Sequence, residues 1–198
     1  AILNDAKFRS LRIPVFPKTF VVLSKIILVD LEVCQKDKDF RMANCWDAVD
    51  QWFHQSEFTQ IGLANCSRQQ LYYVLSQTKT QINYLQIEMS VYYPNAAILA
   101  LSRKATHITI AVNLFGLFSP TLDPACIMPI EEKIVKKIAS QYQKSPGQIL
   151  VKHALQLGLC PLIKSNCITR IRAYAEVDDF ELTAEEMHTL NTALVKHR

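Results

Sequence analysis

Basic and hydroxyl side chains gather near the C-terminus, where they are best suited to binding an anion. Lys164 and Ser165 follow the apolar run 159–163, and Arg170 lies five residues further along. We expect a strand to end at Lys164 and a short helix to begin near Ile168. A helix N-terminus attracts phosphate through its free N–H groups and its dipole. Arginine adds a bidentate fork, and lysine adds a point charge.

This arrangement predicts a phosphate site without glycines at the carboxyl end of a parallel strand, where barrel enzymes bind their ligands. The alternative is a basic turn whose side chains face only solvent. A glycine-rich phosphate loop is excluded, because the chain has only four glycines and contains neither GxGxxG nor GxxxxGK.

The cysteines and histidines do not form a pattern typical of a metal centre or of a nucleophilic enzyme. The six cysteines have no CxxC spacing and no accompanying pair of histidines, so we predict no metal site. We interpret the cysteines as reduced, mostly buried thiols, with disulfides as the less favoured alternative. None of the five histidines forms a Ser/His/Asp arrangement. His153 lies in the middle of a predicted helix, where it is packed or faces solvent.

Helix-start signals and apolar periodicity predict six long helices. Capping boxes begin at Ser67, Ser145 and Thr183. The helix that follows Ser145 should end near Leu157, with Gly158 as its left-handed cap. Periodic apolar residues predict the other helices near 131–142, 95–104 and 46–55, the last opened by Asn44 or Asp47.

Short apolar runs of strand length alternate with these helices. Most are apolar on both faces, which is typical of parallel strands covered by helices. The expected strands cover 26–33, 60–64, 84–89, 108–114 and 159–163. The alternation predicts an α/β protein with a parallel sheet. No linker divides the chain, so we expect a single domain over 1–198 whose first thirty residues or so are irregular. Ile13 to Pro17 is expected to be an edge strand or an extended segment.

Composition narrows the class of protein. Of the 198 residues, 49% are hydrophobic and 20% are charged, which excludes disordered and fibrous classes. The net charge of +4 is mild and spread along the chain, so no nucleic acid is expected as a partner. The apolar stretch Phe20 to Val29 contains Lys25 and is too short to span a bilayer. We therefore expect a cytoplasmic protein. Because the first residue is Ala1, we expect the start to be processed, trimmed or missing.

Three segments resemble the aldo-keto reductase family. IGLANC at 61–66 is similar to the family's IGVSNF motif, and QIEMSVYY at 86–93 is similar to its NQxExHPY segment. The stretch from Ser145 to Leu190, which contains CPLIKSN, resembles the family's C-terminal part. The resemblance runs from about Trp46 to Leu190, some three quarters of the chain. It implies a (β/α)8 barrel, here incomplete or irregular, with parallel strands and outer helices.

The family reduces carbonyl compounds with NADPH, so the resemblance implies residues that hold this cofactor. Lys164, Ser165 and Arg170 match the clamp on the adenosine 2′-phosphate. Asn65 and Gln86 match the pair that binds the nicotinamide carboxamide. Other matched positions have changed: the serine beside the asparagine, the tyrosine that stacks on the nicotinamide, the His-Pro pair and the two adenine contacts. They read Ala64, Val112, Ser90-Val91, Ala173 and Tyr174 here. The implied NADP(H) is therefore expected to bind weakly or no longer to bind.

The catalytic part of the family is missing or degenerate. The family's proton donor is a tyrosine assisted by aspartate, lysine and histidine, and nothing in residues 1–50 resembles its DTAxxYxNE stretch. Lys18 is the one candidate for the lysine. Val29-Asp30-Leu31 resembles the VDLYLIH strand, but its histidine position reads Gln35. Only five strands are evident, against eight in a closed barrel. The residues before Asp30 would then supply a strand or two in irregular form, a partner chain would cover the gap, or the chain is a fragment or a degenerate isoform.

Two functions follow. One is an NADPH-dependent carbonyl oxidoreductase acting on a small aldehyde or ketone. The other is a noncatalytic relative, a pseudoenzyme that keeps the fold for binding or regulation. The missing acid favours the second for this polypeptide, because carbonyl reduction needs a proton donor within reach of the oxygen.

Overall fold

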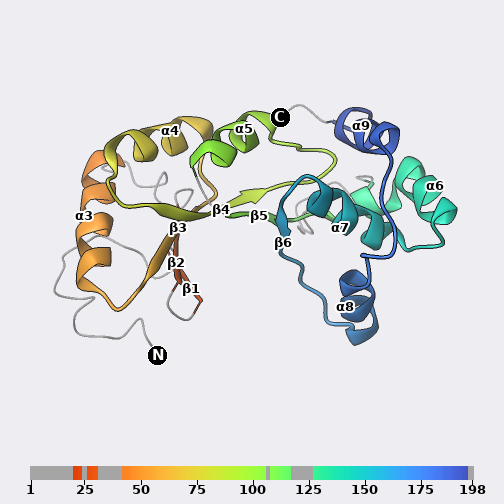
Figure 1. Ribbon diagram of the computed structural model, residues 1–198, viewed down its shortest axis with the longest axis horizontal. Helices are drawn as coiled ribbons and strands as arrows, with labels where there is room; N and C mark the ends of the chain where they lie inside the picture. The colour runs from red at the N-terminus through yellow and green to blue at the C-terminus, as the bar shows by residue number, and fades with distance from the viewer. Residues whose placement is uncertain (1–19, 24–25, 31–41, 106–107, 117–126, 196–198) are drawn as a thin grey trace. The chain divides into compact units, whose positions relative to one another are not determined.

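The computed structural model describes residues 20–23, 26–30, 42–105, 108–116 and 127–195 (Figure 1). Its strands are β1 (Phe20–Leu23), β2 (Ile26–Asp30), β3 (Gln60–Ala64), β4 (Ile82–Glu88), β5 (Ile108–Val112) and β6 (Cys160–Pro161). Its helices are α3 (Met42–Gln55), α4 (Arg68–Gln77), α5 (Ala96–Ala105), α6 (Lys133–Gln141), α7 (Pro146–Gln156), α8 (Ile168–Ala175) and α9 (Ala184–Thr192), with a 3₁₀ turn at Pro129–Glu131. None of the described helices is long and apolar enough to cross a membrane.

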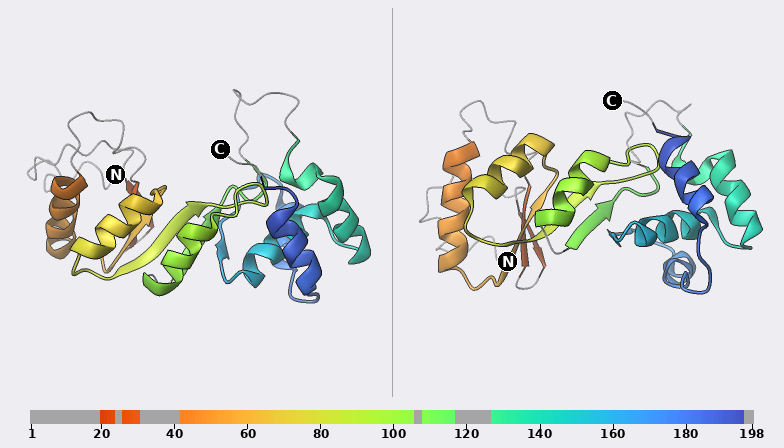
Figure 2. Two further views of the ribbon diagram at one scale, coloured as in Figure 1. Left: turned by 90° about the horizontal axis from the view of Figure 1, so that it is seen from above. Right: turned by 45° about the horizontal axis from the view of Figure 1, so that its top comes forward.

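The chain divides into two compact units. Unit 1 comprises 1–87 and 97–109, and unit 2 comprises 88–96 and 110–198. In unit 1, helices α3 and α4 lie beside strands β2 and β3 in each view (Figures 1 and 2). Unit 2 carries helices α6 to α9. The single domain expected from the sequence stays a prediction.

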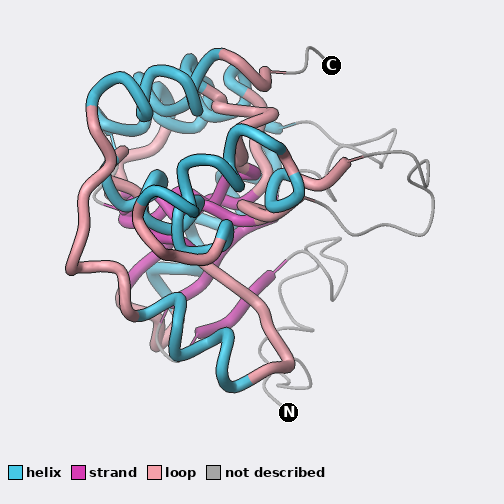
Figure 3. Tube along the Cα trace, turned by 90° about the vertical axis from the view of Figure 1, so that its right-hand side faces the viewer, coloured by secondary structure: helices cyan, strands magenta, loops and turns pink. Residues whose placement is uncertain are grey.

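The strands follow one another in sequence order, from β1 to β6. Strand β2 pairs in parallel with β3, β3 pairs in parallel with β4, and β5 pairs in parallel with β6. Figure 3 shows the strands with helices between them along the chain. The predicted α/β class, with parallel strands and surrounding helices, is confirmed.

Several predicted strand bounds are wrong. The strand expected over 84–89 covers 82–88, and residues 31–33 of the strand expected over 26–33 lie outside the described residues. The strand expected to end at Lys164 ends at Pro161, and one further backbone bond, from Leu162 N to Ala111 O at 2.8 Å, is the last to β5. The strand expected to run to Leu114 ends at Val112. Asn113 then adopts a left-handed φ of 59°, which takes the backbone out of the extended conformation.

Strand β1 was not predicted. The sequence indicates one apolar stretch from Phe20 to Val29, whereas β1 and β2 pair antiparallel, with Phe20 opposite Val29 and Leu23 opposite Ile26. The two residues between the strands are serine and lysine, so the sequence has no glycine, asparagine or proline there to indicate a turn. The expected segment Ile13 to Pro17 lies outside the described residues.

The helices begin where the local signals predict. Ser67, Ser145 and Thr183 each accept a hydrogen bond from the backbone N–H three residues on, and each capping box is complete. Gly158, with a φ of 77°, follows α7 as expected. Two starts differ from the prediction. Helix α3 already begins at Met42, because methionine and alanine before Asn44 are good helix formers. Helix α6 begins at Lys133, because the preceding residues form the 3₁₀ turn.

Each unit has its own buried side chains. In unit 1 the largest fully buried ones come from β2, β3, β4 and α4, and they include Leu28, Ile61, Leu63, Leu71 and Leu85. In unit 2 a hydrophobic cluster joins α6, α7 and α9, with Val135, Ile149, Leu150 and Leu190 at its centre. Helix α8 differs from the others, because it has no buried residue.

Candidate functional site

Three polar residues meet at the carboxyl ends of the strands in unit 1. Ala64, the last residue of β3, is level with Asp30 of β2 and with Gln86 of β4. Asn65 comes next and adopts a left-handed φ of 52°, which asparagine tolerates better than most residues. Its backbone N–H donates to Gln86 O at 3.1 Å, and its side-chain Nδ2 donates to Asp30 Oδ2 at 3.1 Å. The strand ends therefore hold Asn65 from both sides.

The two amides of this group have capacity left for a ligand. Within the described part of the chain, nothing hydrogen-bonds to Asn65 Oδ1 or to the side-chain amide of Gln86. Both side chains are half-buried. An amide offers acceptor lone pairs and N–H donors. These donors and acceptors of Asn65 and Gln86 fit a planar carboxamide, which is the group that the family resemblance implies for the two positions. Sequence reasoning missed Asp30 as a member of this group, although the carboxyl ends of parallel strands meet at one edge of a sheet.

The predicted phosphate residues are all in unit 2: Lys164 and Ser165 lie between β6 and α8, and Arg170 lies in the first turn of α8. Ser165 Oγ accepts a hydrogen bond from Cys167 N at 3.2 Å, which shapes the turn into the helix. Lys164 and Arg170 are exposed, and neither has an ion-pair partner among the described residues. Two cations and a hydroxyl at a helix start fit a phosphate dianion. A basic turn whose side chains face only solvent would leave Lys164 and Arg170 equally exposed, so their exposure does not distinguish the two interpretations.

The described cysteines differ in environment. Cys66 is buried, and burial raises the pKa of its thiol to about 12. Cys167 is half-buried; hydrogen bonds from the backbone N–H and the guanidinium of Arg170 lower the pKa of its thiol. Cys160 is exposed, so one of the three cysteines with described side chains is buried, and the expectation of mostly buried thiols stays a prediction for the six. All of these cysteines are free.

Several changed positions have structural roles. Tyr174 packs on Phe115, with ring centroids 5.1 Å apart, and lies against the backbone of Gly147. Ser90 is buried, and its Oγ accepts a hydrogen bond from Tyr92 N at 3.3 Å. Val112 O accepts a bond from Met89 N at 3.0 Å.

The catalytic candidate Lys18 and the histidine position Gln35 lie outside the described residues.

Two histidines of the described part make side-chain contacts within the fold. His153 is buried on α7, and its Nε2 lies 2.8 Å from Asn191 Oδ1. Burial lowers the pKa of this imidazole. His54 Nε2 lies 2.8 Å from Thr80 Oγ1. No group of three or more histidine, cysteine, aspartate or glutamate residues in the described ranges could hold a metal ion.

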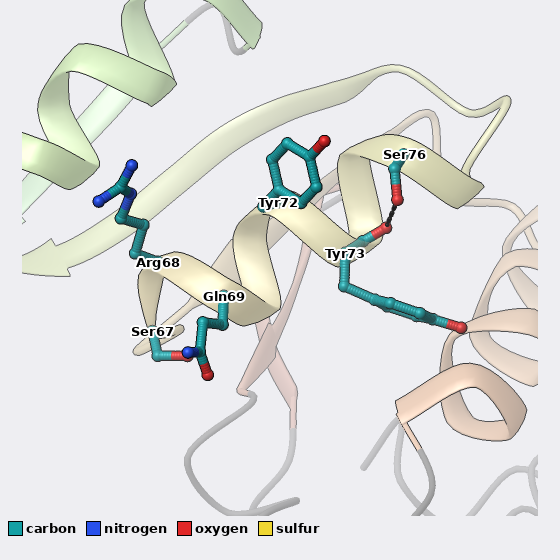
Figure 4. A pocket seen from close by; sticks show the side chains of 6 residues that line it. All are labelled: Ser67, Arg68, Gln69, Tyr72, Tyr73 and Ser76. Atoms are coloured by element: carbon teal, nitrogen blue, oxygen red, sulfur yellow. Dashed lines mark hydrogen bonds between the residues drawn. The ribbon is translucent and has the colours of Figure 1, made fainter.

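A shallow hollow of about 790 Å³ lies on the outer side of α4 (Figure 4). Its lining residues are Ser67, Arg68, Gln69, Tyr72, Tyr73 and Ser76. Tyr72 is 67% exposed, and Figure 4 shows its ring pointing away from that of Tyr73. None of these residues is a predicted site residue.

Comparisons with known proteins agree with the resemblance found in the sequence. No family model matches the chain. The human aldo-keto reductase family 1 member C1 is 26% identical over 150 residues, which are 74% of this chain and 46% of that protein. The chicken aldo-keto reductase family 1 member A1 is 32% identical over 145 residues, which are 72% and 44%. The structure of the aldose reductase from Schistosoma japonicum matches with a TM-score of 0.64 and 26% identity over 78% of this chain and 48% of that one.

These matches confirm the family resemblance over about three quarters of the chain and the barrel-like α/β fold. The chain spans about half the length of the curated relatives it matches.

Proposed function

We propose that this chain, whose curated relatives are aldo-keto reductases, binds NADP(H). We also propose that it lacks the acid that an effective carbonyl reductase needs. The observation that carries the proposal is the position of Lys164, Ser165 and Arg170, which extend from the segment after β6 into the first turn of α8. These residues match the family's clamp on the 2′-phosphate. Neither cation has an ion-pair partner among the described residues, and the Arg170 guanidinium also bonds to the Cys167 thiol.

The residues at the phosphate end would act as charge and hydrogen-bond donors. Arg170 would offer a bidentate fork, Lys164 a point charge and Ser165 a hydroxyl. Because NADH has a hydroxyl where NADPH has the 2′-phosphate, this cluster would discriminate between the two cofactors. In unit 1, Asn65 Oδ1 and the side-chain amide of Gln86 would hold the carboxamide, because neither has a partner among the described residues.

The catalytic deficit supports the noncatalytic alternative. Bound NADPH supplies a hydride to a carbonyl carbon, and the oxygen must then receive a proton from an acid within hydrogen-bond reach. No tyrosine of this sequence matches the family's acid, and Lys18 alone matches one of its helpers. A small carbonyl compound is the substrate class if turnover occurs. A partner chain that covers the incomplete barrel and a cytoplasmic location are part of the same proposal.

Calorimetric titration of the full chain with NADPH and NADH tests the binding proposal. We expect Arg170→Ala to weaken NADPH binding about 10–150-fold, the range for a hydrogen bond to a charged group, and to leave NADH binding unchanged. Arg68→Ala is the matched control, because Arg68 is a described arginine with no match to the clamp. Equal losses for both cofactors would show that Arg170 does not bind the 2′-phosphate. No binding of NADPH to the unmodified chain would overturn the proposal.

A further inference from the structure

The contact between Asp30 and Asn65 adds a residue to the proposed nicotinamide end of the site. We propose that Asp30 is a positioning residue that fixes the Asn65 amide with its Oδ1 as the atom offered to a ligand, so that the site selects a primary carboxamide. The inference rests on the proposed cofactor binding and deepens it, because it states which group accepts and which donates.

The orientation of the Asn65 amide follows from chemistry. An ionised carboxylate only accepts hydrogen bonds, so the Asn65 atom that lies 3.1 Å from Asp30 Oδ2 is Nδ2 and not Oδ1. The backbone of the same residue is held by its hydrogen bond to Gln86 O and by its left-handed φ. Main chain and side chain are therefore anchored on the two neighbouring strands.

In this orientation the side chain of Asn65 offers a hydrogen-bond acceptor to a ligand, and that of Gln86 can offer a donor. With Nδ2 bonded to Asp30, the free acceptor of Asn65 is Oδ1, which has no partner among the described residues. The free amide of Gln86 can donate through Nε2. A carboxamide complements both, because its N–H can bond to Asn65 and its oxygen can accept from Gln86. A methyl ketone at the same position lacks the N–H, and a carboxylate would face Asn65 Oδ1 acceptor to acceptor.

Cofactor analogues test this assignment by binding, without any turnover. NADP⁺ is compared with its 3-acetylpyridine analogue, in which a methyl ketone replaces the carboxamide, and with its nicotinic acid analogue. By calorimetry the unmodified chain should bind NADP⁺ about tenfold more tightly than either analogue, the effect of one lost hydrogen bond. Asp30→Ala should reduce this ratio to within about twofold, because Asn65 is then free to turn. Asp30→Asn should also reduce the ratio, because an amide can donate as well as accept and so no longer dictates which atom of the Asn65 side chain faces it.

Two controls separate this inference from the cofactor proposal. The fragment 2′,5′-ADP has no pyridine ring, so its affinity should be the same in the unmodified chain and in the Asp30 variants. Asp178→Ala, at an exposed position, should leave every ratio unchanged. If Asp30→Ala does not fold, Asn65→Ala takes its place and should also remove the preference.

Equal affinity of the unmodified chain for NADP⁺ and the acetylpyridine analogue would overturn the inference while the cofactor proposal stands. A preference that survives both Asp30→Ala and Asn65→Ala would overturn it as well. If neither 2′,5′-ADP nor NADP⁺ binds, both proposals are wrong.

Discussion

Cys66 and Cys167 carry the same thiol, but their surroundings shift its pKa in opposite directions. Burial raises the pKa of Cys66 to about 12, whereas Arg170 lowers that of Cys167. Because the thiolate is the nucleophile, the two should differ in reactivity at neutral pH.

We therefore expect iodoacetamide at pH 7 to modify Cys167 much faster than Cys66, as followed by peptide-resolved mass spectrometry. Arg170→Ala should slow the alkylation of Cys167, because loss of the guanidinium raises the pKa of the thiol. The exposed Cys160 serves as an internal reference, since Arg170 is not among its described contacts. An unchanged rate for Cys167 in the variant would contradict the role of Arg170.

His153 should make stability depend on pH. Burial lowers the pKa of this imidazole from 6.5, so the unfolded chain binds the proton more readily than the folded one. Stability from this group is complete above about pH 6.5 and is lost as the pH falls toward the folded pKa. Urea unfolding at pH 7.5 and 5.5 should show a smaller loss for His153→Gln than for the unmodified chain. An equal loss in both would assign the pH dependence to other groups.

At the scale of elements, Gly62 sets the spacing of three strands. A Cβ built on it would overlap Leu28 Cδ2 and would lie 2.8 Å from the backbone oxygen of Tyr84. Because backbone cannot move aside, Gly62→Ala should lower the free energy of unfolding by about 1–3 kcal/mol or more. Gly158→Asn is the control, since its surroundings are empty and asparagine tolerates a positive φ. Chemical denaturation that gives equal stability for both variants would contradict this packing.

The capping box of α4 provides a second test at this scale. Ser67→Ala removes the side-chain acceptor for Gln70 N and should cost about 1 kcal/mol in urea unfolding. Ser76→Ala in the last turn of the same helix is the matched control and should stay within about 0.5 kcal/mol. A larger loss for Ser76 than for Ser67 would contradict the capping role.

Local signals explain which elements the sequence could predict. Capping boxes fix helix starts within a few residues, so α4, α7 and α9 begin as expected. Strand limits depend on pairing with distant residues, which explains the short β6 and the unexpected β1. The candidate site also has a part that local motifs predict and a part that depends on contacts between distant residues. Motifs indicated Asn65 and Gln86, but the bond between Asn65 and Asp30 is a contact between strands 35 residues apart that no local pattern contains.

At the scale of the whole molecule, the sequence predicts a chain with little or no carbonyl reductase activity. General acid help contributes typically 10²–10⁴-fold, and loss of the stacking residue at Val112 loosens the reacting ring. We expect purified protein, NADPH and a panel of reactive aldehydes to give no measurable loss of reduced-cofactor absorbance. Robust turnover that Lys18→Ala abolishes would show that the N-terminal residues rebuild part of the family's site. Robust turnover that survives this change would indicate an unrecognised acid.

Helix α8 buries none of its residues, although it carries Arg170. Few apolar contacts oppose its local opening, so its amide protons should exchange with deuterium early, well before those of the buried α7. A phosphate bound at its first turn would have to hold the helix closed. Part of the binding energy would then be used to order α8. The measured affinity would equal the intrinsic affinity multiplied by the fraction of molecules in which the helix is already closed.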